Sequence, residues 1–357
     1  MSISPKGATD YAVADLFVRS DYLVLSGYPG LPGAIDQLKV FNDLMVASTK
    51  SSPACLLTYS RRTGELITSI CEQGDAPGQY QSIQDFQYIE ESNQFVLLDR
   101  SRKRIMYFDG DGQYLWEEEH PGSFSANAFA IFATGDFLFY AANGHEETGN
   151  RLIQWNPEDG TITGQYLPVI PEQQQFLNIQ ESNNFYQVDG QWRFAKAFDP
   201  HMYQIAADQP PTPAFRLAYG EHDLPEEMLY RSYDNVYEFF TALRKTDYAF
   251  NRLNYVEHTD HLAFFLEWRE TFLLALYDKK SGNYRMVSGL TDFPGCPSLE
   301  PDPFLDYGPL AVTPDGYLVF YLEDLTADPT LATCLATITD AETAPEAVDF
   351  VLFLGQP

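Results

Sequence analysis

The sequence predicts an all-β fold: a six-bladed β-propeller with four-stranded antiparallel blades, whose ring is closed by the N- and C-terminal strands. Three observations support this prediction. Aromatic residues make up 15% of the 357 residues, mostly as 26 Phe and 23 Tyr, which is typical of β-rich proteins. A glycine-containing hairpin pattern recurs along the chain, and one apolar strand is left over near each end.

The recurring pattern is that of a β-hairpin. It appears as YSRRTGELI, FDGDGQYLW, WNPEDGTIT and YDKKSGNYRM, which begin at residues 59, 108, 155 and 277. Each copy has an aromatic residue, polar turn residues, a glycine and then alternating apolar residues, as a tight hairpin requires. The first three copies start about 48 residues apart, which is the length of one four-stranded blade.

The other blades follow from the same spacing. One further step reaches Tyr203, where MYQIAADQPPTPAFRL offers two strands, and DYGPLAVTPDGYLVFYL from Asp306 begins a sixth blade. AVDFVLFL near the C-terminus and DLFVRSDYLVL near the N-terminus are expected to complete that blade together. A single blade cannot bury both of its faces, so blades stack in a ring, and closing the ring removes two exposed sheet edges.

We expect a single propeller domain over residues 10–357 that carries small helical insertions. The step from Tyr203 to the repeat at residue 277 is longer than the others, which predicts an insertion at 221–248. Within it, YDNVYEFFTALRK has apolar residues at helical spacing, and a second short helix is expected at 328–338. Such spacing usually marks packing against a core, so both helices are expected to cover a rim of the ring.

The segment EQGDAPGQY, Glu72–Tyr80, resembles a phosphate-binding loop in its two glycines. Such a loop needs the pattern G-x-x-x-x-G-K-[ST] before a helix, whereas Gly78 is followed by Gln79 and Tyr80 and then by the strand SIQDFQYI. We therefore interpret the segment as the connection from the outer edge of the first blade to the inner edge of the second.

This region also resembles a known family. The run CEQGDAPGQYQSIQDFQYIEESNQFVLLDRSRKRIMYFDGDGQYL resembles the NHL-type repeat and, more closely, the six-bladed propellers abundant in Bacteroidetes, which carry a G-x-G-P-G-E-Y-like signature between blades one and two. Four positions match that signature: Gly74, Pro77, Gly78 and Tyr80. Ala76 and Gln79 depart from it. PAFRLAYG, LLALYDKKSG and the last apolar strand extend the resemblance over most of the chain.

The resemblance implies an exported location, in the periplasm or at the outer membrane and cell surface, because members carry lipoprotein signal peptides. MSISPKGATDYA has no signal-peptide pattern, so we expect the chain to be either cytosolic or the mature form of an exported protein. In the second case, an untrimmed precursor could carry a lipid anchor. No apolar run reaches the roughly 18 residues of a membrane-spanning helix. The net charge of −29 disfavours nucleic acid and anionic membranes as partners.

Two short clusters are candidate ligand sites. EHTDH offers His258, Asp260 and His261 as metal ligands if the backbone turns there, although a polar hairpin tip is the simpler interpretation. RSRKR offers Arg100, Arg102 and Arg104 as an anion pocket, although such runs usually mark a solvated turn. DGDG at 109–112 lacks the residues of a calcium-binding EF-hand loop and is interpreted as a hairpin turn.

The four cysteines leave two alternatives open. Cys55 and Cys71 are equally distant from Thr63, so the hairpin turn is expected to bring them close, and a disulfide is one alternative in an oxidising compartment. Buried free thiols, also at Cys296 and Cys334, are the preferred interpretation, because free cysteine packs as a small hydrophobic residue.

The sequence favours a non-enzymatic binding propeller whose ligand sits over the axial channel, where loops from several blades converge. The abundant aromatic residues make a glycan or a peptide a suitable ligand, and no cofactor is expected. The alternative is a calcium- or metal-dependent hydrolase resembling lactonase propellers, with an axial ion held by carboxylates. A structural platform for another protein is a third reading, and no catalytic triad motif stands out.

Overall fold

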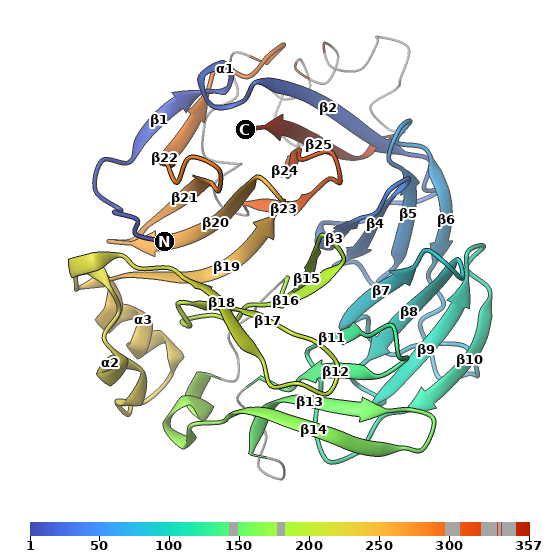
Figure 1. Ribbon diagram of the computed structural model, residues 1–357. Helices are drawn as coiled ribbons and strands as arrows, with labels where there is room; N and C mark the ends of the chain where they lie inside the picture. Colours follow the sequence, from blue (N-terminus) through green and yellow to red (C-terminus); the bar gives the residue numbers. More distant parts are fainter. Residues whose placement is uncertain (143–148, 177–182, 297–307, 323–333, 335–336, 338–347) are drawn as a thin grey trace.

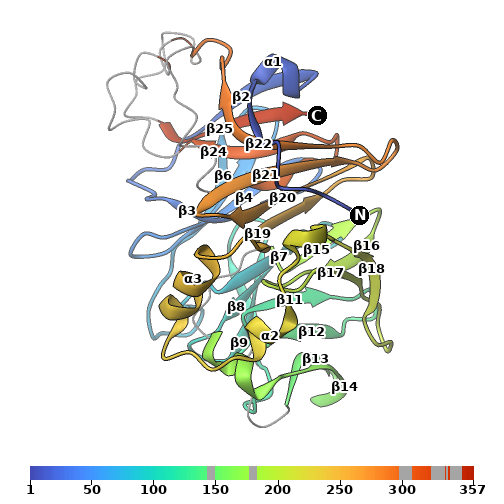
Figure 2. The ribbon, with the colours of Figure 1, turned by 90° about the vertical axis from the view of Figure 1, so that its left-hand side faces the viewer.

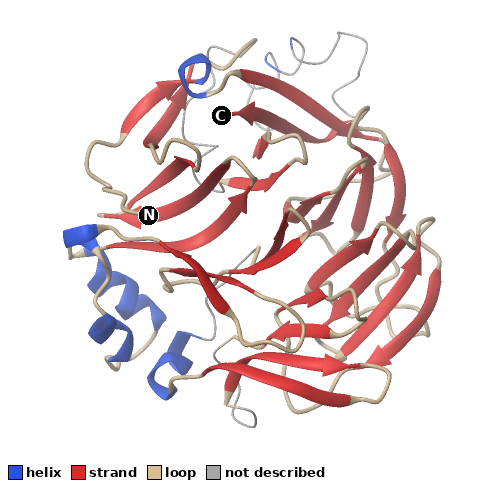
Figure 3. Ribbon diagram, viewed as in Figure 1, coloured by secondary structure: helices blue, strands red, loops and turns tan. Residues whose placement is uncertain are grey.

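In the computed structural model, six β-sheets are arranged around a central axis, as Figure 1 shows. The structure describes residues 1–142, 149–176, 183–296, 308–322, 334, 337 and 348–357. Strands form the whole ring and the helices lie outside it (Figure 3). The predicted six-bladed propeller is confirmed.

The first three blades follow one another along the chain. Blade 1 contains β3 (Ile35–Val40), β4 (Leu44–Thr49), β5 (Leu56–Ser60) and β6 (Leu66–Ile70). Blade 2 contains β7 (Asp85–Ile89), β8 (Gln94–Asp99), β9 (Arg104–Asp109) and β10 (Tyr114–Glu119). Blade 3 contains β11 (Ala128–Ile131), β12 (Phe137–Tyr140), β13 (Asn150–Asn156) and β14 (Thr161–Pro168), followed by the 3₁₀ helix η1 (Pro171–Phe176).

The other three blades include the insertion and both ends of the chain. Blade 4 contains β15 (Phe185–Val188), β16 (Gln191–Phe194), β17 (His201–Gln204) and β18 (Thr212–Arg216). Blade 5 contains β19 (Ala249–Glu257), β20 (His261–Trp268), β21 (Thr271–Asp278), β22 (Tyr284–Thr291) and, at its outer edge, β1 (Thr9–Ala12). Blade 6 contains β23 (Pro309–Val312), β24 (Leu318–Leu322), β25 (Val348–Gln356) and β2 (Arg19–Ser26).

The two faces of the ring differ in their connections. The innermost strands β3, β7, β11, β15, β19 and β23 lie nearest the axis and all begin at one face, which we call the entry face. Because the strands of a blade alternate in direction, the described blade-to-blade connections 27–34, 71–84, 120–127 and 217–248 lie at the entry face. Short turns such as 41–43 and 258–260 lie at the opposite, exit face. The entry face therefore carries the long connections.

Both ends of the chain close the ring, as predicted. β2 pairs with β25 in an antiparallel ladder from Arg19–Gln356 to Ser26–Val348. The buried ring of Phe353 packs against Phe17 and Phe320 at centroid distances of 5.8 and 6.0 Å, and these two rings also contact each other. These aromatic contacts join the terminal strands into one apolar core with the neighbouring blade.

The first residues of the chain make contacts that the sequence did not predict. β1 pairs with β22 in parallel and becomes a fifth strand of blade 5, and the short helix α1 (Val13–Leu16) leads from there to β2. Ser2 forms a β-bridge with Ala218, and the amino group of Met1 donates to the Arg216 carbonyl at 2.7 Å. The N-terminal segment therefore crosses blades 4 and 5 before it reaches blade 6.

The predicted helix in the insertion is confirmed. The connection 217–248 contains η2 (Gly220–His222), α2 (Glu226–Tyr230) and α3 (Val236–Arg244), and α3 begins where the Asn235 side chain accepts from the Glu238 N–H at 3.0 Å. Phe239 and Leu243 are buried in an apolar cluster with Phe198 and Phe250. Figure 2 shows α2 and α3 at the side of the ring. The second expected helix, 328–338, lies outside the described residues except for Cys334 and Thr337. No described helix is both long enough and apolar enough to cross a membrane.

The segment Glu72–Tyr80 belongs to the predicted connection between blades 1 and 2, and side chains from the end of β8 and from the β8–β9 turn hold this connection. Arg102 donates to the carbonyls of Gly74 and Gln79 at 2.8 and 3.0 Å and pairs with Asp75 at 2.6 Å. Asp99, which is fully buried, accepts from the N–H of Gln81 at 2.7 Å. Gly74 and Gly78 therefore belong to a turn that polar contacts hold in place, and a role in binding phosphate is not needed to account for them.

The preferred interpretation of the cysteines as free thiols was wrong. Cys55 and Cys71 form a disulfide with 4.4 Å between their Cα atoms, and Cys296 and Cys334 form another with 5.0 Å. The physical reason for the first bond is the register of the hairpin: Leu56 pairs with Ile70, so the two cysteines continue the same ladder just beyond the strand ends. Their Cα separation lies at the short end of the range for disulfides.

Candidate functional site

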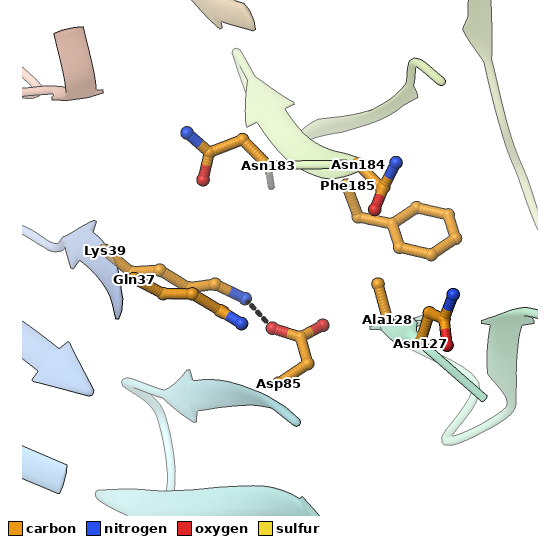
Figure 4. A pocket seen from close by; sticks show the side chains of 8 residues that line it. All are labelled: Gln37, Lys39, Asp85, Asn127, Ala128, Asn183, Asn184 and Phe185. Carbon is orange, nitrogen blue, oxygen red and sulfur yellow. Dashed lines mark hydrogen bonds and ion pairs between the residues drawn. The ribbon is translucent and has the colours of Figure 1, made fainter. Parts of the chain in front are cut away.

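A polar pocket lies near the axis, where the starts of the innermost strands β7, β11 and β15 meet the side chains of β3. It is called the mouth pocket here and is lined by Gln37, Lys39, Asp85, Asn127, Ala128, Asn183, Asn184 and Phe185 (Figure 4). β3 supplies the first two residues, and the others stand at or just before the start of β7, β11 and β15. Side chains from four blades thus converge at one concave place, which is the kind of position where ligands commonly bind.

An ion pair forms one side of the mouth pocket. Lys39 Nζ donates to Asp85 Oδ1 at 2.7 Å and to the Phe86 carbonyl at 2.5 Å, and both side chains are mostly buried, with exposures of 16% and 6%. Gln37 and Lys39 are two residues apart on β3, so both point toward Asp85, as Figure 4 shows. The pair therefore joins blades 1 and 2 and leaves this side of the pocket without net charge.

Asp85 also reaches the third blade. Its Oδ1 accepts from the N–H of Phe86 at 2.8 Å, and its Oδ2 accepts from the N–H of Phe129 at 2.9 Å. Three donors besides solvent thus hold the carboxylate in place, which is what a buried anion requires. Asp85 therefore has a structural role, because it connects blades 1, 2 and 3.

Three amide side chains of the mouth pocket donate to backbone carbonyls. Gln37 donates to the Gln84 carbonyl at 2.8 Å, and Asn183 of blade 4 donates past blade 5 to the Leu310 carbonyl of blade 6 at 2.7 Å. Asn184, which is buried, donates to the Ala195 carbonyl at 3.0 Å. The bond from Asn183 links blades 4 and 6 directly, so the channel is bridged at its mouth on the side of blade 5.

One amide oxygen of the mouth pocket accepts no hydrogen bond from the described residues. Asn127 Oδ1 is buried and accepts no hydrogen bond from any described residue, although the backbone N–H of Asn127 donates to the Tyr140 carbonyl at 2.7 Å. Phe185 provides an apolar wall of the same pocket. The space inside the pocket that a water-sized group can occupy is about 10 Å³, which admits about one water molecule or one small polar group of a ligand.

The predicted metal ligands lie elsewhere, on the exit face. His258, Thr259 and Asp260 form the turn between β19 and β20, where the His258 N–H donates to the His261 carbonyl at 2.9 Å. The rings of His258 and His261 are 5.1 Å apart between centroids, and burial together with the His258 charge lowers the pKa of His261 to about 4.

Asp260 does not join that pair of rings. Its carboxylate pairs with Lys280 at 2.9 Å, and this hydrogen bond lowers its pKa. Within the described ranges, no three His, Cys, Asp or Glu side chains are grouped so as to hold a metal ion. The structure thus brings His258 and His261 together without Asp260, and a metal site there stays a prediction.

The three predicted anion-binding arginines diverge. Arg102 holds the connection 71–84, as described above. Arg104 pairs with Glu117, and its second nitrogen is 3.7 Å from Glu119. Arg100 is exposed at the turn. Two of the three side chains thus have carboxylate partners within blade 2 and its connection, and an anion pocket there stays a prediction.

DGDG at 109–112 is a hairpin turn, as predicted. Asp109 Oδ1 accepts from the N–H groups of Asp111 and Gln113 at 3.0 and 2.8 Å. This is the Asx-type turn that aspartate favours, and backbone donors occupy the carboxylate.

Sequence reasoning expected a ligand over the axis but named none of the mouth residues. The usable signal was positional: Asp85, Asn127 and Asn184 each stand where a long connection meets an innermost strand. That signal becomes readable only after the blades are assigned, because an isolated Asp or Asn before a strand is an ordinary turn residue.

Comparison with known proteins agrees with the fold. A family model described as "Domain of unknown function (DUF4934)" matches residues 30–333. A solved structure of a candidate exported protein from Bacteroides fragilis is similar over 99% of both chains at 16% identity, with a TM-score of 0.77. A member of the DUF4221 family from Bacteroides vulgatus is similar over 96% of both chains at 8% identity, with a TM-score of 0.54. None of the curated proteins matches this sequence.

Proposed function

This chain belongs to the DUF4934 family, and we propose that it is a non-enzymatic binding propeller of the periplasm or cell surface, which holds one end of its ligand in the mouth pocket. The observation that carries the proposal is the convergence of polar side chains from four innermost strands at the face with the long connections. Loops and strand starts that meet at an axis are the usual ligand-contacting part of such folds.

The chemistry of the mouth pocket supports binding over catalysis. Among its lining residues, Asp85 is the single acid, and Lys39 neutralises it within hydrogen-bond distance. A hydrolase of the two-carboxylate kind or an axial calcium site would need further acids at this point. None of the described mouth residues supplies a second carboxylate or a nucleophile paired with a base.

An exported location is supported by the two disulfides. Cys55–Cys71 and Cys296–Cys334 would not persist in a reducing cytosol, whereas they are normal in the periplasm and at cell surfaces. The similarity to a candidate exported protein points the same way. The measurement is the redox state of the four cysteines in protein isolated under thiol-trapping conditions, where fully reduced cysteines would contradict this location.

The function is tested by blocking the mouth pocket. A thermal-shift screen of glycans, peptides and metal salts is run on the wild-type protein and on Asn127→Trp, whose indole would fill the pocket. Gln165→Trp, on the exposed outer strand β14, is the matched control. We expect a ligand that raises the Tm of the wild-type and control proteins but not of Asn127→Trp. A ligand that stabilises all three equally would place binding outside the mouth pocket.

A further inference from the structure

Most outer edges of the ring are contacted by other parts of the chain or expose polar side chains. β1 covers β22 in blade 5, and the first residues of the chain bond to the backbone at the end of β18 in blade 4. In blades 6 and 1, the hairpin turn of the next blade contacts the outer strand, through the Ser26–Gly64 and Thr68–Asp111 hydrogen bonds. β14 of blade 3 exposes mainly Thr and Gln side chains. Covered or polar edges keep a sheet from pairing with other chains.

The outer edge of blade 2 is open. β10 is the last strand of its sheet and lies at the outside of the ring in Figure 1. The His120 N–H donates to the Lys103 carbonyl, and this bond sets the alternation of the β9–β10 ladder. Because bonded residues alternate along an antiparallel strand, the backbone groups of Glu117 and Glu119 face outward. No described residue forms a hydrogen bond with them, so they are free to pair with another strand.

Three consecutive large apolar side chains are exposed at the start of this edge. Tyr114, Leu115 and Trp116 have exposures of 37%, 39% and 41%. The ring of Trp116 stacks on Tyr107 at 4.3 Å between centroids, which holds the indole against the sheet. No other described strand exposes three large apolar side chains in succession. An open edge that also exposes apolar side chains is a surface on which another strand readily pairs.

The charge of the edge favours a basic partner over a second copy of this chain. Glu117, Glu118 and Glu119 follow the apolar residues, and Arg104 is the described cation that pairs with two of them. This half of β10 therefore stays negative, within a chain of net charge −29. Pairing of two β10 strands would bring the glutamates of both copies into one sheet, where they repel. Lysine or arginine opposite the glutamates would instead be attracted.

We propose that β10 is a docking edge for an extended segment of another protein that carries lysine or arginine between apolar residues. The segment adds a strand to blade 2 by bonding to the outward backbone groups of Glu117 and Glu119. Its cations pair with the glutamates, and its apolar side chains contact Leu115 and Trp116. This edge is separate from the mouth pocket, so the inference goes beyond the proposed function and does not depend on it.

The experiment uses the full chain and three capped octapeptides as probes. The basic probe alternates lysine with valine and threonine, and the acidic probe has glutamate in place of lysine. The third probe is the basic peptide N-methylated at every residue, which keeps the charge but removes the backbone donors that strand pairing needs. Binding is followed by fluorescence anisotropy at physiological ionic strength. We expect the basic probe to bind with a Kd below about 1 mM, and the other two to bind about tenfold more weakly or less.

Variants place the binding on β10. Leu115→Lys puts a repelling charge on the docking edge, and Thr163→Lys puts the same charge on the exposed outer strand β14 as a matched control. Leu115→Lys should weaken the basic probe about tenfold or more, and Thr163→Lys less than about twofold. Glu119→Pro removes an outward N–H without removing a bond to β9 and should weaken the probe as well. Bound basic probe should slow amide hydrogen exchange at Glu117 and Glu119.

Four outcomes would overturn the inference. The basic probe fails to bind at about 1 mM, or the N-methylated probe binds as tightly as the basic one, which would exclude strand pairing. Equal weakening by Leu115→Lys and Thr163→Lys would assign the binding to the general charge of the chain. A wild-type dimer in analytical ultracentrifugation that Leu115→Lys converts to a monomer would assign the docking edge to a second copy.

Discussion

The contact that joins the C-terminal strand to the first blade offers a direct test of ring closure. Asp349 of β25 accepts from the Tyr28 N–H at 2.9 Å and from the Tyr59 hydroxyl at 3.0 Å, both at Oδ2. Tyr59 belongs to β5 and is fully buried. Replacing Asp349 by Ala would leave two donors without an acceptor at the junction of blades 6 and 1.

The expected cost can be worked out from these contacts. A buried donor left unpaired costs about 1–3 kcal/mol. Asp349→Ala leaves two such donors, but it also removes a half-buried charge, which offsets part of the cost. We therefore expect the free energy of unfolding to fall by about 2 kcal/mol. For 357 residues the unfolding entropy is about 0.75 kcal/mol per kelvin, so Asp349→Ala should lower the Tm by about 3 °C.

Asp349→Asn separates the hydrogen bonds from the charge. Burial raises the pKa of Asp349, so the folded protein holds this proton more tightly than the unfolded chain does. The contribution of Asp349 to the free energy of unfolding therefore falls as the pH rises from the ordinary Asp pKa, about 3.9, through the raised value. Asn keeps an acceptor oxygen without the charge. The free energy of unfolding of Asp349→Asn should therefore rise relative to that of the wild-type protein as the pH increases over this range.

The assay is thermal unfolding followed by circular dichroism from pH 4 to 8, with Asp43→Ala on the exposed β3–β4 turn as control. The control should change the free energy of unfolding by less than about 0.5 kcal/mol. At pH 7 we expect Asp349→Ala to be less stable than Asp349→Asn by about 2 kcal/mol. Equal stability of the two variants, or an Ala variant as stable as the control, would refute the role assigned to these hydrogen bonds in closing the ring.

Further predictions concern closure, the axis and pH. A chain truncated before Ala347 lacks β25, which pairs with both β24 and β2, so we expect no soluble folded protein, and a monomeric product with a cooperative melt would contradict closure. Lys39→Met leaves the buried Asp85 carboxylate without its cation and should cost about 3 kcal/mol in denaturant unfolding, whereas the Lys39→Met, Asp85→Asn pair should recover part of that loss. Burial lowers the pKa of His120 to about 4. Because the unfolded chain takes up this proton near pH 6.5, wild-type stability should fall by up to about 1.4 kcal/mol per pH unit toward pH 4, and His120→Gln should lose less. EDTA should leave the Tm unchanged, and a drop of several degrees that calcium reverses would instead support the axial metal alternative.

Local patterns were enough to predict the hairpins. The turn glycines Gly64 and Gly112 have φ values of +74° and +80°, a conformation that few other residues adopt at low cost, so their positions in the sequence mark the turns. The helix around Phe239 was equally readable, because its apolar spacing and the Asn235 cap are both local features.

Features that depend on contacts between distant segments were missed. β1 is short and pairs in parallel with β22, more than 270 residues away in the chain, and nothing in TDYA indicates that partner. The disulfides were misjudged for a related reason: spacing showed that Cys55 and Cys71 approach each other, but only the ladder beyond Leu56 and Ile70 shows that the two sulfur atoms meet.

By itself, the sequence determined that this chain forms a closed ring of six blades. Most blades are built from segments that follow one another in the chain, and their turn residues and their alternation of apolar and polar residues are local features of the sequence. It also determined which strands close the ring, since two apolar strands had no local partner. Only the tertiary structure decided which side chains line the mouth pocket. Lys39, Asp85 and Asn127 lie in three different blades, and each reads as an ordinary strand or turn residue until the closed ring brings their polar groups together at the axis.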